Sequence, residues 1–146
     1  MRPSKLLAQA EELLRTGRAD EALPIATSFL MRLQRDGLRT LPALNLLGEI
    51  NLELGNVDKA RSYFLTAVHA DPDGSIPEAQ GGGAEKFLWL AQLSEEGGQD
   101  SVDWFERGAT VLRNEIAAIG DGGAGKDKRK KLSEALCGII EVSTLL

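Results

Sequence analysis

Residues 39–72 place small and large apolar side chains at spacings that strongly limit the folds available to this chain. Gly48 and Ala60 are small at points where two antiparallel helices would have to approach closely. Leu47 and Phe64 are large and would fill the seam between those helices. A Gly-Asn pair between the two apolar stretches favours a tight turn. The stretch therefore predicts a pair of antiparallel helices.

Looser copies of this pattern lie on both sides of the stretch. The matching upstream positions are Leu6, Leu13, Gly17, Ala22 and Phe29. The matching downstream positions are Phe87, Leu90, Ala91, Ser94, Gly98, Ser101 and Phe105. A last segment with Leu132, Leu136, Cys137 and Ile140 is typical of the first helix of a further unit. Because one helix pair cannot bury its own apolar face, we expect these copies to stack.

The pattern resembles the tetratricopeptide repeat, a two-helix unit of about 34 residues. The positions in the central copy that carry the resemblance are Leu44, Leu47, Gly48, Asn51, Gly55, Ala60, Phe64, Ala67 and Pro72. The resemblance implies an all-α fold, a tetratricopeptide-like right-handed superhelix of antiparallel helix pairs with about seven helices.

We expect a single helical-repeat domain over residues 1–146. Its units should lie at about residues 4–36, 40–72 and 84–119, followed by the first helix of a truncated fourth unit at 130–144. The expected helices are residues 4–15, 19–36, 40–54, 57–70, 85–96, 99–119 and 130–144. The unpaired last helix predicts a homodimer formed by swapping.

Two connections, residues 71–84 and 120–125, are rich in glycine and predict mobile loops. Each could become ordered on a partner, or each could be an ordinary long surface connection. The sequence leaves both interpretations open.

Composition indicates a globular chain with 42% hydrophobic residues and no long apolar run, so we expect no membrane association. The N-terminal stretch is too short and too charged for a signal peptide. The single cysteine excludes an intrachain disulfide framework and fits a reducing compartment. These features predict a protein of the cytoplasm and nucleus.

Residues 120–126 match part of a phosphate-binding loop, whose backbone amides and lysine would hold nucleotide phosphates. Three features argue against a nucleotide site. Asp127 replaces the hydroxyl residue that binds magnesium, a helix pattern precedes the loop, and no strand pattern occurs in the chain. The sequence also lacks the residue sets that nucleophilic catalysis or a metal site requires. We therefore expect no enzyme activity, no cofactor and no metal, with nucleotide binding as the enzymatic alternative.

Several single residues have ordinary structural interpretations. We expect Cys137 to be a packed thiol, Phe105 to lie in the core, and His69 to lie near a helix end. One of Trp89 and Trp104 could instead be an exposed anchor for a partner.

Acidic side chains dominate the offsets that line the concave groove of a tetratricopeptide superhelix. The chain has a formal net charge of −5, although residues 126–131 hold five bases and one acid. The predicted partner-binding residues are Glu11, Asn45, Glu49, Leu52, Glu53, Glu85, Glu95, Glu96, Glu134 and Glu141, of which Asn45 and Leu52 are neutral groove contacts. The opposing bases are Arg15 and Lys131. A groove of this kind favours a cationic peptide, whereas the alternative is that these are ordinary solvated glutamates on helices.

Tetratricopeptide co-chaperones grip an acidic C-terminal tail with a clamp of basic and amide side chains. The corresponding offsets of this chain hold Leu7, Glu11, Leu46, Glu85 and Trp89, which would repel such a tail. Direct binding of nucleic acid is disfavoured for the same reason, because phosphate contacts need basic groups.

Residues 82–112 and 130–142 resemble the dedicated assembly chaperones of large-subunit ribosomal protein four, which are fungal helical-repeat proteins. The resemblance extends over most of residues 40–142. It implies a nonenzymatic chaperone that captures the newly made, basic ribosomal protein, shields its long internal loop and escorts it to pre-ribosome assembly. That family continues through further repeats and an acidic tail after the point where this sequence stops. The alternative function is a generic tetratricopeptide scaffold for protein–protein interaction, or a co-chaperone.

A basic run of Lys128, Arg129, Lys130 and Lys131 resembles a nuclear import signal. A solvated, basic helix start is the alternative interpretation.

Overall fold

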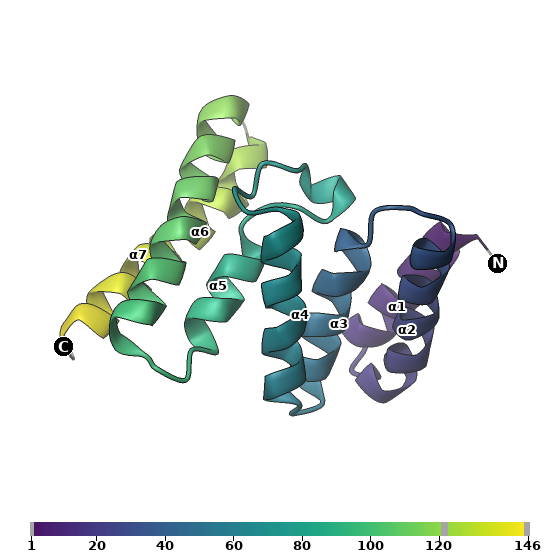
Figure 1. Ribbon diagram of the computed structural model, residues 1–146. Coiled ribbons are helices and arrows are strands. Elements are labelled where there is room, and N and C mark those ends of the chain that lie inside the picture. Colours follow the sequence, from purple (N-terminus) through teal and green to yellow (C-terminus); the bar gives the residue numbers. More distant parts are fainter. Residues whose placement is uncertain (1, 121–122, 145–146) are drawn as a thin grey trace. The chain divides into compact units, whose positions relative to one another are not determined.

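The computed structural model describes residues 2–120 and 123–144, and these residues form helices without any strand (Figure 1). The seven α-helices of the described residues are α1 (Pro3–Arg15), α2 (Ala19–Arg35), α3 (Leu41–Glu53), α4 (Val57–Ala70), α5 (Glu85–Gln92), α6 (Gly98–Ile119) and α7 (Lys126–Thr144). Two short 3₁₀ helices, η1 (Glu78–Gln80) and η2 (Gly123–Gly125), lie in the long connections. The predicted all-α fold of paired helices is therefore confirmed.

The chain divides into two compact units. Unit 1 comprises residues up to 70 together with 79–81, and it contains α1 to α4. Unit 2 comprises residues 71–78 and those from 82 onward, and it contains α5 to α7. The expectation of one domain across the whole chain stays a prediction.

Helix pairs in unit 1 are joined by turns in which glycine has a positive φ angle. Gly17 and Gly55 both have φ near +80°, a conformation that glycine adopts without steric cost. The amide of Gly55 donates to the carbonyl of Leu52 (3.1 Å), and the next amide donates to the carbonyl of Asn51 (2.8 Å). The same pair of bonds closes the turn at Gly17. Both turns are Schellman motifs, which satisfy the last carbonyls of one helix and reverse the chain.

Small residues bring the helices of unit 1 into close contact. Ala10, Ala22 and Ala26 are fully buried and pack with Leu47 and Ile50 of α3. Because an alanine side chain extends so little, the α1, α2 and α3 backbones can approach closely while the larger side chains fill the seam.

Gly48 of α3 faces Phe64 of α4, and the sequence predicted that both residues lie where these two helices pack. A Cβ atom on Gly48 would lie 2.7 Å from the Phe64 ring, which is too close for a real side chain. Phe64 is 1% exposed. The glycine is therefore what permits the ring to pack between these helices.

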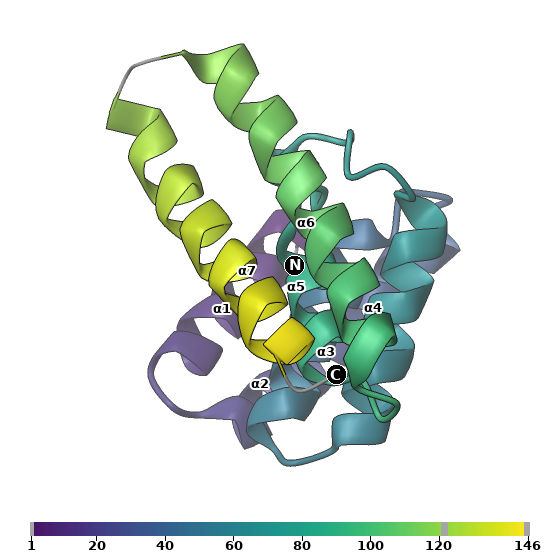
Figure 2. The same ribbon diagram turned by 90° about the vertical axis from the view of Figure 1, so that its left-hand side faces the viewer.

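Unit 2 departs from the expected helix boundaries at two points. Helix α5 ends at Gln92 rather than at residue 96, because the Ser94 hydroxyl accepts a hydrogen bond from the Gly97 amide (3.0 Å) and donates one to Asp100. These bonds stabilise a turn in place of further helix. At the other end of the unit, α7 begins at Lys126, earlier than the expected residue 130. Figure 2 shows α7 running alongside α6.

The connection after α4 is anchored within unit 2 by a buried ion pair that was not predicted from the sequence. The Lys86 ammonium lies 2.7 Å from the Asp71 carboxylate, and both side chains are almost completely buried. Lys86 also donates to the carbonyl of Gly83 (2.8 Å), while Asp71 accepts from the amide of Ile76 (3.1 Å). These contacts do not support the expectation of a freely mobile segment at 71–84.

Further along the same segment, Gly74 is buried against Val111 and Phe87, where a Cβ atom would lie 2.5 Å from a Val111 methyl carbon. The Arg107 guanidinium donates to the carbonyl of Pro72 (3.0 Å). Its charge also lies 4.8 Å from the ring centres of both Phe87 and Trp104. The start of the segment is thus packed onto α5 and α6.

Candidate functional site

In unit 1, the predicted partner-binding residues of α3 share one face of the helix. Asn45, Glu49, Leu52 and Glu53 are separated by four, three and one positions, which places them on adjacent turns of one side. The first three are half-buried and Glu53 is exposed. Glu11 is exposed on α1. The periodicity of the helix therefore brings the α3 residues together.

Asn45 has a structural role as well as its predicted one. Its side-chain amide donates to the carbonyl of Gly81, and Arg39 donates to the side chain of Gln80 (2.8 Å). These two bonds hold residues 79–81 against the rest of unit 1. The Arg15 guanidinium, predicted as an opposing base, pairs with Glu12 of its own helix.

In unit 2, the structure changes the setting of three predicted acids. Glu95 and Glu96 lie beyond the end of α5, so they do not continue its face, although both belong to the described residues. Glu85, in the first turn of α5, forms an ion pair with Lys131 of α7. Its charge is thus already compensated within the unit.

A groove of about 470 Å³ lies between α5 and α7 of unit 2. Two predicted acids, Glu134 and Glu141, lie along its α7 side, together with Lys131. Apolar side chains contribute from α5 and α6. The residues that line the groove are Leu88, Gln92, Phe105, Lys131, Ser133, Glu134, Ala135, Cys137, Gly138 and Glu141. The groove thus combines an apolar lining with two exposed carboxylates.

Phe105 and Cys137 differ from their predicted settings. Phe105 is half-buried rather than in the core, because it lines the groove between α5 and α7. Its ring also lies against Gly138 of α7, where a Cβ atom would come within 2.7 Å of the ring. Cys137 is exposed and lines the groove, so the prediction of a packed thiol was wrong.

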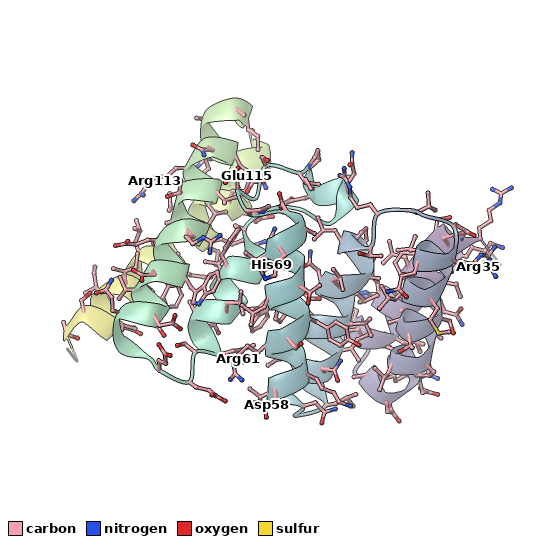
Figure 3. The ribbon with its side chains drawn as sticks, in the orientation of Figure 1. Arg35, Asp58, Arg61, His69, Arg113 and Glu115 are labelled. Carbon is pink, nitrogen blue, oxygen red and sulfur yellow. The ribbon has the colours of Figure 1, made fainter. Side chains whose placement is uncertain are left out.

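Both tryptophans are half-buried in unit 2, so neither is a fully exposed anchor. Trp104 lies with its ring centre 6.3 Å from that of Phe87 and contacts Arg107. His69 is exposed in the last turn of α4, as expected (Figure 3).

The basic run is helical and partly engaged in ion pairs. The Lys128 ammonium lies 2.7 Å from Glu115 of α6 and 2.8 Å from Glu78 of η1. In Figure 3, Glu115 lies on the side of α6 that faces residues 71–78, whereas Arg113 lies on the opposite side of that helix. Arg129 and Lys130 are exposed. The helix period thus divides the candidate import signal into paired and exposed bases.

These ion pairs change the acid–base properties of the two paired lysines. Burial by itself would lower the pKa of Lys128, but hydrogen bonds to Glu115 and Glu78 and the charges of both carboxylates raise it above the ordinary value. Burial would likewise lower the pKa of Lys131, but the hydrogen bond to Glu85 and the charge of that carboxylate raise it above the ordinary value. Both lysines are therefore charged at neutral pH.

The structure does not provide the context that a phosphate-binding loop requires. Asp121 and Gly122 lie outside the described residues. Helix α6 precedes them, η2 follows them, and Lys126 is the first residue of α7. A phosphate-binding loop would instead connect a strand to a helix.

Metal and membrane sites are also not found in the described part of the chain. Over residues 2–120 and 123–144, no three His, Cys, Asp or Glu side chains are grouped so as to hold a metal ion. No helix among these residues has the length and apolar character needed to span a bilayer.

Known proteins related to the chain share one description. This chain is 59% identical over 111 residues to the "Probable assembly chaperone of rpl4" of Emericella nidulans. It is 32% identical over 136 residues to the protein of the same description from Schizosaccharomyces pombe. A solved structure described as "Assembly Chaperone of RpL4 (Acl4)" superposes with a TM-score of 0.89 at 47% identity. The chain resembles the assembly chaperones of ribosomal protein L4.

The match to these chaperones covers most of this chain but only part of each relative. It extends over 76% and 93% of the chain for the two curated relatives, and over 97% for the solved structure. The chain spans 29% and 37% of the curated relatives and 54% of the solved chain. No protein-family model matches it. The predicted resemblance to the fungal chaperones and the helical-repeat fold are both confirmed.

Proposed function

We propose that this chain binds newly made ribosomal protein L4 as an assembly chaperone and acts without catalysis. The observation that carries the proposal is the 59% identity, over 76% of the chain, to a protein described as an assembly chaperone of rpl4. The 47% identical solved structure of a protein with the same described role supports it.

Acidic side chains provide the physical basis for capturing such a client. Proteins that bind ribosomal RNA need lysine and arginine for phosphate contacts, so they are basic before assembly. The chain has a net charge of −5 and carries Glu49 and Glu53 on one face of α3. Glu134 and Glu141 line the groove of unit 2. These carboxylates would neutralise basic segments of the client until RNA competes for them.

This mechanism predicts that affinity for the client falls as salt rises. Exposed charges more than about 8 Å apart are largely screened at physiological ionic strength, and the screening distance shortens with added salt. Capture by an apolar surface would not show that decrease.

The direct test is a pull-down of purified ribosomal protein L4 by the tagged chain, with affinity measured by calorimetry. We expect the combined change of Glu49, Glu53, Glu134 and Glu141 to glutamine to weaken binding roughly tenfold or more, since each charge pair with the client contributes up to about 1 kcal/mol.

A matched control removes four exposed acids from α2, α4 and α6 instead. It changes Asp20, Asp58 and Asp103 to asparagine and Glu106 to glutamine. Because the net charge change is the same, near wild-type binding of this control would show that position matters as well as charge. Equal binding by both variants and the wild type would contradict the proposal and favour a generic interaction scaffold or co-chaperone.

Nucleotide binding is the enzymatic alternative, and calorimetry with nucleotide and magnesium tests it separately. We expect no heat of binding, because the loop at 120–126 lacks a preceding strand and has Asp127 in place of the magnesium-binding hydroxyl. A saturable heat would contradict a purely binding role.

We also propose that the chain travels with its client between cytoplasm and nucleus. Arg129 and Lys130 are the exposed bases of the candidate import signal. A fluorescent fusion that stays nuclear when both are changed to alanine would show that this run is not the signal. The homodimer predicted from the last helix stays a prediction, for which the molar mass from light scattering is the test.

A further inference from the structure

The groove between α5 and α7 contains a base where a basic client would need acids. Its α7 side presents Lys131, Glu134, Gly138 and Glu141, which are spaced by three or four residues and so share one helix face. The Lys131 ammonium crosses to the carboxylate of Glu85 on α5. Both side chains of this pair are about two-fifths exposed, at 40% and 43%. The pair therefore lies within reach of solvent and of an incoming cation.

The lining suits the side chain of a lysine or arginine. Leu88 and the Phe105 ring, which packs over Gly138, form an apolar surface on which the methylene stem of such a side chain can lie. Glu134 and Glu141 then offer carboxylates to its charged end. A volume of about 470 Å³ is large enough for such a side chain and the adjoining backbone.

We propose that this groove binds a lysine or arginine side chain of the basic client, and that Lys131, which lines the groove while paired with Glu85, acts as a competing base there. An incoming base either displaces Lys131 from Glu85 or binds Glu134 and Glu141 against the repulsion of Lys131. In both cases the Lys131–Glu85 pair lowers the affinity for weakly basic segments. Highly basic segments still bind, because several of their charges contact carboxylates of the chain at once. This inference rests on the proposed function and adds a selectivity device to it.

The exposed thiol of Cys137 allows occupancy of the groove to be measured directly. It is the single cysteine of the chain and lines the groove. A fluorescein-labelled peptide of lysine, arginine and glycine should slow the reaction of this thiol with a disulfide reagent. A peptide with glutamine at every basic position serves as the blank. The concentration that halves the reaction rate then measures affinity at this groove, and fluorescence anisotropy measures total binding.

We expect Lys131→Gln to lower the half-protection concentration roughly two- to fivefold, because an exposed ion pair contributes up to about 1 kcal/mol. Lys130→Gln is the matched control, since it removes the same charge from the exposed neighbour. The pair Glu134→Gln and Glu141→Gln should raise the half-protection concentration by a similar or larger factor. Its control is Asp103→Asn with Glu106→Gln, two exposed acids of α6.

Each outcome bears on the proposal. Tighter binding by Lys131→Gln alone, with weaker binding by the Glu134 and Glu141 variant, supports it. Peptide binding by anisotropy that leaves Cys137 unprotected, or equal effects of the variants and their controls, overturns the groove while leaving the proposed function intact. A wild-type chain that does not bind the peptide at all overturns the groove, while the pull-down of ribosomal protein L4 decides the proposed function separately. A second copy of this chain as the occupant is shown by thiol protection that rises with protein concentration alone, and it also overturns the proposal.

Substitution of these exposed side chains should leave the fold intact. Thermal unfolding followed by circular dichroism checks this for each variant. If Lys131→Gln is destabilised, Glu85→Gln releases the same ion pair from the other partner. It should leave Lys131 free to repel the peptide and so weaken thiol protection. Tighter protection by Glu85→Gln would overturn the competitor role.

Discussion

Unit 1 and unit 2 are both built from packed helices, but different interactions hold them. Unit 1 has a core of alanines and leucines, and Schellman turns join its pairs. Unit 2 combines apolar packing with charge. Lys86 and Asp71 are paired in its interior, and Lys128 bridges Glu78 and Glu115. The residues of unit 1 follow the repeat pattern, whereas unit 2 includes a long connection that its ion pairs hold in place.

This difference shows how a helical repeat can accommodate an insertion. The insertion here is the connection at residues 71–84, between α4 and α5. Its backbone and polar side chains need hydrogen-bond partners that a regular helix pair does not supply. In unit 2, Asp71 begins the insertion and Lys86 follows it, and the two neutralise each other in the interior. A buried pair of this kind is weak evidence for added stability, but it penalises any arrangement in which the two charges separate.

The largest effect expected is from Asp71→Ala, which leaves the Lys86 ammonium buried without its counter-ion. We expect unit 2 to lose about 3–5 kcal/mol of its free energy of unfolding. Trp89 and Trp104 both belong to unit 2 and are the two tryptophans of the chain, so urea unfolding followed by tryptophan fluorescence reports this unit.

Two controls sharpen that experiment. Asp73→Ala removes an exposed acid nearby and should change stability by no more than about 0.5 kcal/mol. The double change Asp71→Leu with Lys86→Met replaces the pair by apolar groups and should recover much of the loss. An Asp71→Ala variant as stable as the wild type would contradict the conclusion that a buried ion pair helps to hold unit 2 together.

A smaller effect is expected in unit 1 from Gly48→Ala. The new Cβ atom would lie 2.7 Å from the Phe64 ring, which is buried and cannot move aside. Overpacking outweighs the gain in helix propensity, so we expect a loss of about 1–2 kcal/mol. Hydrogen exchange of α3 and α4 peptides measures it. Ser28→Ala, an exposed position on α2, is the control, and unchanged exchange in Gly48→Ala would contradict the packing argument.

Lys128→Gln should cost unit 2 about 1 kcal/mol at neutral pH, because it removes two charge-assisted hydrogen bonds from a side chain that is 14% exposed. The raised pKa of Lys128 determines the pH dependence. Its stabilisation is complete below the unfolded lysine pKa of about 10.4 and is lost as pH rises through the higher folded value.

Urea unfolding of wild type and Lys128→Gln should therefore differ at neutral pH and converge in strong alkali. Lys130→Gln removes the same charge from an exposed site and should match the wild type throughout. A difference between wild type and Lys128→Gln that persists unchanged above the raised pKa would show that the effect is not ionic.

The smallest effect is expected from Gly138→Ala in unit 2. Its Cβ atom would also lie 2.7 Å from a phenylalanine ring, that of Phe105. Phe105 is half-buried beside the groove and can shift, and alanine is the better helix former by about 1 kcal/mol. The two effects should nearly cancel in urea unfolding followed by tryptophan fluorescence. A loss as large as that of Gly48→Ala would mean that unit 2 is packed as tightly here as unit 1.

Much of the fold could be predicted because local spacing determines it. The positions of Gly17 and Gly55, the small Gly48 and Ala60, and the apolar period of each helix all act within one helix or between helices that are adjacent in the chain. The helix boundaries in unit 1 were therefore predicted closely. Those of unit 2 were missed where a side chain decides them, as Ser94 does at the end of α5.

The candidate site was less predictable, because helix periodicity gives the face of a residue but not its partner. The α3 acids share a face as expected. The sequence placed both Glu85 and Lys131 in the predicted concave groove. Their pairing could not be predicted, because it depends on two helices that are distant in sequence. The exposure of Cys137 likewise depends on how α7 is rotated against α6.

By itself the sequence determined that the chain forms antiparallel helix pairs with an acidic character, since periodic burial and charge are local properties. Tertiary structure alone decided which charges remain available. Lys128 contacts a carboxylate 50 residues away, and Lys86 contacts one 15 residues away. Such pairs form only when packing brings the groups together and excludes water, because charges that far apart along a solvated chain interact too weakly to select each other.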